Sequence, residues 1–169
     1  MPSKMPETIS AKTRTVPLYW ISLLRIMLGV LFLSTWASNL GKGFYTPDGL
    51  FNFFTTVFPQ AVNPLTFYAA FINQVILPLR NVFAPFQLVA ELLLGLFLLL
   101  GIFTPMVSLA AGFFILNTFL ATFGHDWPWS YLTILAILGI TFITLAGRSL
   151  GIDTWFYQKW GEPPFPFLW

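Results

Sequence analysis

Long apolar runs separated by short polar breaks dominate this chain, and four of these runs are long enough to cross a bilayer. An α-helix rises about 1.5 Å per residue, so about 20 residues cross a hydrocarbon core about 30 Å thick. We therefore predict an all-α integral membrane protein, a bundle of four transmembrane helices at roughly Leu18–Leu40, Val82–Phe103, Met106–Phe123 and Ser130–Ala146.

The connection between the first and second predicted spans, residues 41–81, is too long and too apolar for an aqueous loop. Pro59, Pro64 and Pro78 divide it into pieces that are too short to span the membrane. Asn63 followed by Pro64 is typical of a helix start. We expect one or two interfacial helices here, covering one end of the bundle. A contact between residues 66–79 and a partner protein is the alternative.

The ends of the chain differ from its apolar middle, and residues 1–169 are interpreted as a single membrane domain. Residues 1–16 form a polar tail ahead of an uncleaved first span. Residues 161–169, GEPPFPFLW, combine prolines with aromatic side chains and are expected on the membrane interface or against a neighbouring subunit.

An even number of spans places both ends of the chain on the same side of the membrane. That side carries five basic residues in the tails and the last turn, and the opposite side carries Lys42 and Arg80. Because basic residues are enriched on the cytoplasmic side, we expect cytoplasmic termini in a prokaryotic inner membrane.

Composition agrees with this placement, since 57% of the 169 residues are hydrophobic and 8% are charged. Such a chain cannot cover a water-exposed surface with charge. It has no cysteine, which excludes disulfides and Cys-ligated zinc or iron–sulfur centres within the chain. A net charge of +2 without a basic stripe argues against nucleic acid as a partner. His125 and Asp126 supply too few ligands for a zinc site, so no metal is predicted.

Two ionisable residues fall inside predicted spans, namely Arg25 in the first and Glu91 in the second. An intramembrane charge is expensive, is usually paired, and marks function by default. If the two spans end at the same level, an extended Arg25 reaches Glu91. The first interpretation is a structural ion pair that locks the bundle. The second is a site at which Glu91 accepts or relays a proton for a lipid-soluble ligand such as a quinone. Gly29 and Gly95, one turn from each charge, favour close backbone approach.

Aromatic residues supply a second group of candidate contacts. Trp127 and Trp129 flank a proline between the third and fourth predicted spans, beside His125. The first interpretation of these aromatic residues is a belt at the membrane interface. The second is a surface where a quinone headgroup or a pigment could lie, with His125 as its hydrogen-bond partner. Trp36 follows Arg25 by eleven residues, on the same helical face, and joins this group of candidate contacts.

Three stretches of sequence resemble the DoxX/DoxD family: RIMLGVLFLSTWASNLGK, ELLLGLFLLLGIFTP and WPWSYLTILAILGITFITLAGRSLGID. DoxD is the small-subunit type linked to terminal quinol oxidase and thiosulfate:quinone oxidoreductase. The long first loop is more similar to DoxD than to the shorter DoxX proteins. The resemblance implies a four-helix membrane bundle that works beside a quinone together with a second subunit.

Three classes of function follow. The first is a membrane subunit of a quinone-linked, DoxD-like oxidoreductase that is inactive alone and associates with lipids and other membrane subunits. The second is a non-catalytic accessory subunit of a larger respiratory or photosynthetic complex, in contact with its proteins or pigments. The third is a small transporter, against which stand the lack of an internal repeat and of paired broken helices.

Overall fold

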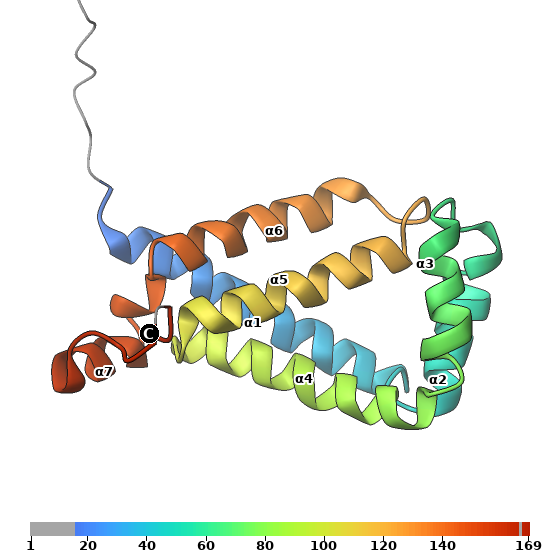
Figure 1. Ribbon diagram of the computed structural model, residues 1–169, viewed down its shortest axis with the longest axis horizontal. Helices are drawn as coiled ribbons and strands as arrows, with labels where there is room; N and C mark the ends of the chain where they lie inside the picture. Colours follow the sequence, from blue (N-terminus) through green and yellow to red (C-terminus); the bar gives the residue numbers. More distant parts are fainter. Residues whose placement is uncertain (1–15, 166) are drawn as a thin grey trace, which may run out of the picture.

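The computed structural model describes residues 16–165 and 167–169, and all regular elements in this part are helical. Four long helices lie along one axis (Figure 1). Helix α1 packs mainly against α4, and α5 packs mainly against α6. Their bounds are α1 (Leu18–Gly41), α4 (Arg80–Leu100), α5 (Thr104–Ala121) and α6 (Pro128–Ile143). The predicted polar tail, residues 1–16, lies outside the described residues except for Val16.

Three of these helices, α1, α4 and α5, are long and apolar enough to cross a membrane by length and composition. Helix α6 is equally apolar but has only 16 residues. The predicted helices differ from the observed ones by about three residues or fewer at each end. Phe103, predicted inside the second span, instead lies in the turn before α5, with a left-handed backbone at φ 48°.

The segment between α1 and α4 folds into short helices stacked at one end of the bundle. In Figure 1, α2 and α3 run across the bundle axis rather than along it. The elements are α2 (Pro47–Asn52), the π-helical turn η1 (Phe53–Val57), the 3₁₀ turn η2 (Gln60–Val62), α3 (Thr66–Phe71) and the π-helical turn η3 (Ile72–Ile76). In the structure, the segment between α1 and α4 thus consists of short helical pieces at one end of the bundle.

Two amide side chains fasten this segment to α5. Gln60 Nε2 donates to the carbonyl of Ala121 over 2.9 Å, and Asn63 Nδ2 donates to the carbonyl of Leu120 over 3.1 Å. The last carbonyls of a helix have no partner within the helix, so these amides satisfy them from outside. Helix α3 begins at Thr66 rather than beside Pro64, and the side-chain Oδ1 of Asn63 accepts from the Leu65 N–H.

Glycines set the register between α1 and α4. A Cβ on Gly29 would lie 2.5 Å from the backbone nitrogen of Leu99, and one on Gly95 would lie 2.9 Å from the side chain of Leu33. Only a residue without a Cβ permits such a crossing. The close approach predicted from these two glycines is confirmed, and it places Gly29 level with Leu99.

The opposite end of the bundle carries the C-terminal segment. After α6 the chain forms the 3₁₀ turn η4 (Ala146–Arg148) and then α7 (Ile152–Trp160). The tail after α7 turns back, so that Trp169 is only 8% exposed and its ring packs on those of Phe156 and Trp160. Part of the predicted aromatic tail thus docks on its own chain, while Phe165 stays exposed.

Candidate functional site

Glu91 lies buried near the middle of α4, on the half of the bundle that faces the α2–η3 segment. Its Oε2 accepts a hydrogen bond of 2.5 Å from the hydroxyl of Tyr45, which lies in the turn between α1 and α2. Glu91 is 3% exposed and Tyr45 is 7% exposed, so both groups are shielded from water. The side chain of Asn39, at the end of α1, also interacts with both.

Tyr45 is the proton donor in this pair. Burial, followed by the interaction with Glu91, raises the pKa of Tyr45 above its ordinary value. The phenol therefore stays protonated throughout the physiological range, and Glu91 supplies the acceptor oxygen. A carboxyl group and a phenol this close together can hold and pass a proton inside an apolar surrounding.

Trp36 lies beside this pair and donates its indole N–H to the carbonyl of Leu88 over 3.1 Å. The ring packs against an apolar cluster that also contains Phe44, Leu50 and Ala84. The structure therefore brings Trp36 and Glu91 to the same end of the bundle. The indole N–H is already used by the backbone, so the part of Trp36 that remains for a ligand is its apolar ring.

Arg25 lies at the other end of the bundle and does not meet Glu91. Its Nη1 donates to the carbonyl of Leu98 and, over 3.1 Å, to that of Leu99, and its Nη2 donates to the carbonyl of Leu150 over 2.7 Å. The predicted Arg25–Glu91 ion pair is wrong. Arg25 instead satisfies carbonyls at the C-terminal end of α4, where a helix carries partial negative charge.

The error has a physical cause in the helix register. With Gly29 level with Leu99 and Gly95 level with Leu33, Glu91 lies opposite Ala37. Ala37 is twelve residues beyond Arg25, which at the rise of an α-helix is about 18 Å. The ion pair requires Leu18 and Phe103 to lie at the same depth, but α1 extends well past the end of α4.

Asp153 of α7 completes the arrangement around Arg25. The carboxylate is 0% exposed and accepts the N–H of Phe103 over 2.7 Å and that of Thr104 over 2.8 Å. It therefore caps the N-terminus of α5 from a distant part of the chain. Burial raises the pKa of Asp153, and the two N–H donors and the charge of Arg25 oppose that rise.

The turn between α5 and α6 forms a second candidate site. His125, Asp126 and Trp127 line a surface cavity of about 360 Å³ together with Phe119 and Phe123. Two of the predicted contact residues, His125 and Trp127, therefore line the same cavity. Trp129 is 70% exposed and does not line this cavity.

A row of aromatic rings connects the two candidate sites. The His125 ring lies 6.0 Å from that of Phe58, which lies 4.8 Å from Phe53. Phe53 lies 4.7 Å from Phe44, and Phe44 lies 5.4 Å from Tyr45. The cavity and the buried Glu91–Tyr45 pair thus belong to the same end of the bundle, which no sequence spacing revealed.

Sequence reasoning did not identify Tyr45 and Asp153 as site residues. Tyr45 directly precedes the helix start of Thr46 and Pro47, where the Thr46 hydroxyl accepts the Gly49 N–H. The Thr-Pro helix start indicates where the turn lies in the sequence, but not how far the Tyr45 phenol reaches into the bundle. Asp153 belongs to the AGRSLGID stretch, yet its partners lie about 50 residues earlier. In the described part of the chain, no three His, Cys, Asp or Glu side chains gather as a metal site would require.

Comparison with known proteins identifies the family. The DoxX family model matches residues 20–126, which is 107 of the 169 residues. No curated protein and no solved structure matches the chain. The match includes the first two stretches that resemble the family and both Arg25 and Glu91, while the AGRSLGID stretch lies outside it. The chain belongs to the DoxX family and is an integral membrane protein.

Proposed function

From membership of the DoxX family, we propose that the chain is the membrane subunit of a quinone-linked oxidoreductase of the DoxD, thiosulfate:quinone type. The observation that carries this proposal is the buried Glu91–Tyr45 pair. Reducing a quinone to a quinol takes a pair of electrons and a pair of protons. The electrons would come from a partner subunit, because this chain offers no cysteine for a metal cluster or redox disulfide. The protons need a protein group that can reach the bound quinone.

Glu91 fits the role of proton donor to a bound quinone, and Tyr45 fits that of the group which reprotonates it. In this scheme Glu91 hands its proton to the quinone oxygen and regains one through the Tyr45 hydroxyl. The His125 cavity, with Trp127 beside it, would let the headgroup approach from the lipid. The ring of Trp36 would lie against the quinone from the α1 side.

The membrane arrangement is part of the same proposal. We assign α6 as a fourth span, because it packs along α5 and so shares its depth. The α2–η3 segment runs across the bundle axis, as helices in the plane of the interface do (Figure 1). The end that carries Arg148 and Lys159, together with the basic tail, would face the cytoplasm of a prokaryotic cell.

One observation favours the second function, a non-catalytic accessory subunit of a respiratory or photosynthetic complex. Glu91 and Tyr45 lie in a packed region, and neither the His125 cavity nor the larger cavity beside Arg148 is lined by them. A quinone would therefore reach Glu91 only if the α2–η3 segment and its row of aromatic rings moved aside. An accessory subunit would use the pair only to fasten that segment to α4.

Purification from the native membrane in mild detergent separates the two functions. Co-eluting proteins and extracted quinones or pigments are identified by mass spectrometry, and thiosulfate-dependent quinone reduction is measured. We expect Glu91→Gln to assemble normally and lower turnover by about a hundredfold or more, the usual contribution of a general acid. Tyr45→Phe should have a smaller effect of the same kind.

Ser34→Ala is the matched control, since the Ser34 hydroxyl is exposed and, among the described residues, bonds to the carbonyl of Leu31 within α1. It should leave assembly and turnover unchanged. A Glu91→Gln complex that turns over like the wild type would refute the catalytic role. Co-purification with a large pigment- or haem-bearing assembly, without quinone, would instead favour the accessory subunit.

A further inference from the structure

Arg148 organises the C-terminal end of the bundle, opposite the Glu91–Tyr45 pair. Its Nη2 lies 3.0 Å from Glu162 Oε2 and donates to the carbonyl of Trp169 over 2.9 Å. Its guanidinium carbon lies 4.4 Å from the ring centre of Tyr157. The side chain is held firmly while 20% of it stays exposed.

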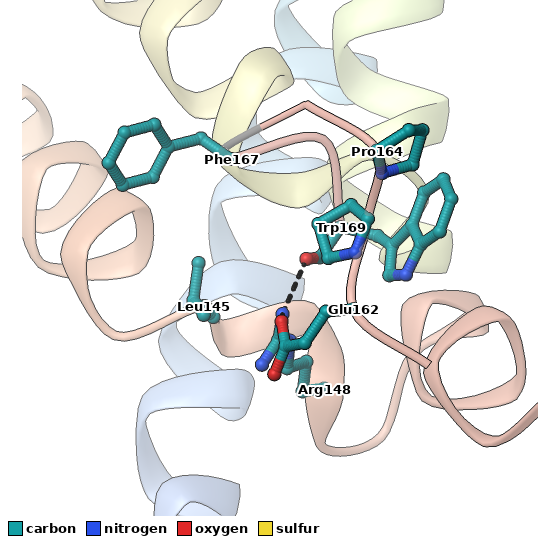
Figure 2. Close-up of a pocket in the computed structure, with 7 residues that line it drawn as sticks. Leu145, Arg148, Glu162, Pro164, Phe167 and Trp169 are labelled. Atoms are coloured by element: carbon teal, nitrogen blue, oxygen red, sulfur yellow. Dashed lines mark hydrogen bonds and ion pairs between the residues drawn. The ribbon is translucent and has the colours of Figure 1, made fainter. Parts of the chain in front are cut away.

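A cavity of about 560 Å³ opens beside this guanidinium. Figure 2 shows Leu145 and Phe167 on one side of it and Pro164 and Trp169 on the other, with Arg148 and Glu162 between them. The walls are thus apolar and aromatic, and the charged groups lie together at one place. A site of this kind suits a ligand with a compact charged group and an apolar remainder.

Arg148 has hydrogen-bonding capacity left for such a ligand. A guanidinium has five N–H donors, and the two bonds described above both use Nη2. Within the described part of the chain no hydrogen bond from Nη1 is found, and the side chain lines the cavity with 20% of its surface exposed. The forked geometry of arginine matches a phosphate, which accepts two parallel hydrogen bonds.

Glu162 is a replaceable partner for Arg148. Its side chain is 70% exposed, and an exposed ion pair contributes little because water and salt compete with it. An anion with more acceptor oxygens can therefore displace it. The carboxylate then acts as a competitor for the site rather than as part of it.

The surroundings place the cavity at the membrane boundary. Helix α6 ends five residues before Arg148, and its outer face presents the exposed Ile140 and Ile143. Phe167 at the rim lies 5.1 Å from Phe142 of the same helix. On α7, Lys159 lies over the rings of Trp155 and Trp160, as expected for side chains at a lipid–water interface.

We propose that this cavity binds the phosphate group of a phospholipid, with Arg148 as its ligand and the acyl chains along the outer face of α6. The continuity between the charged cavity and the apolar helix face distinguishes a lipid from a free phosphate ion. The site lies at the other end of the bundle from Glu91 and does not depend on the proposed quinone chemistry.

The test uses the full purified chain in detergent and counts bound lipid by native mass spectrometry. The probes are phosphatidylglycerol and a diacylglycerol with the same acyl chains and no phosphate. We expect the first to bind and the second not to bind. Arg148→Gln should weaken binding of phosphatidylglycerol about tenfold, the loss of one charge-assisted hydrogen bond.

Glu162→Gln gives the sharper result, because it removes the competitor and leaves Arg148 in place. It should strengthen phosphatidylglycerol binding, whereas a residue that only holds the tail would give no gain. Lys159→Gln removes the same charge from the neighbouring surface and should change binding less than Arg148→Gln does. Equal binding of both lipids, or no gain in Glu162→Gln, would overturn the proposal. Displacement of the lipid by inorganic phosphate at equal concentration would assign the site to free phosphate instead.

Discussion

The capping of α5 by Asp153 predicts a large loss of stability when this carboxylate is removed. In Asp153→Ala the N–H groups of Phe103 and Thr104 lose their acceptor. Both bonds go to a charged group, and each such bond contributes about 1.5–3 kcal/mol. Because the site is 0% exposed, water cannot replace the carboxylate without rearrangement. We therefore expect the free energy of unfolding to fall by about 3–5 kcal/mol.

The assay is reversible unfolding of the purified chain in mixed micelles, followed by circular dichroism. Glu162→Gln is the control, since it also removes one carboxylate but from an exposed ion pair. Glu162→Gln should lower the free energy of unfolding by less than about 1 kcal/mol. Asp153→Asn retains one acceptor oxygen and should fall between the two. If Asp153→Ala cost no more than Glu162→Gln, the carboxylate would not be stabilising α5, and the capping argument would fail.

Two further predictions follow from the geometry. Arg25 and Glu91 lie about 18 Å apart along the bundle, so the losses of unfolding free energy in Arg25→Ala and Glu91→Gln should add within about 0.5 kcal/mol in the double variant. A larger deviation from additivity would show that the two side chains interact after all. Burial raises the pKa of Tyr68 from about 10, the ordinary value for a tyrosine, to about 12. The neutral phenol therefore contributes fully to stability below about pH 10, and this contribution is lost as the pH rises through 12. The melting temperature of Tyr68→Phe in detergent should therefore fall less steeply than that of the wild type between those values, and parallel curves would contradict the assignment.

The long helices could be predicted from the sequence because lipid imposes a simple rule on them. A span must be apolar over its whole length and satisfy its own backbone, so its position is visible in composition alone. For a related reason, the segment between α1 and α4 is not expected to span the membrane, since prolines divide it into pieces that are too short. The glycines Gly29 and Gly95 also indicated a close crossing of two helices.

The partners of the buried charges could not be predicted in the same way, because they depend on how far one helix slides along another. A shift of a few residues between α1 and α4 changes which group Arg25 can reach. The register is set by where Gly29 meets Leu99, which involves shape rather than composition. Tyr45 and Asp153 come from turns, whose depth in the bundle follows no periodic pattern.

The capping contacts explain why Glu91 is a better functional candidate than Arg25. In a membrane, an unpaired carbonyl or N–H at a helix end finds no water, so a buried polar or charged side chain that satisfies one has a structural purpose. Arg25 does this for α4, Asp153 does it for α5, and Gln60 and Asn63 do it at the other end of α5. Glu91 satisfies no helix end, since it accepts its hydrogen bond from a side-chain hydroxyl, that of Tyr45, and not from a backbone N–H. Burying the Glu91 carboxyl costs free energy, and this cost is not explained by a helix end that needs a partner, as it is for Arg25. A carboxyl retained for proton transfer is expected to show this pattern.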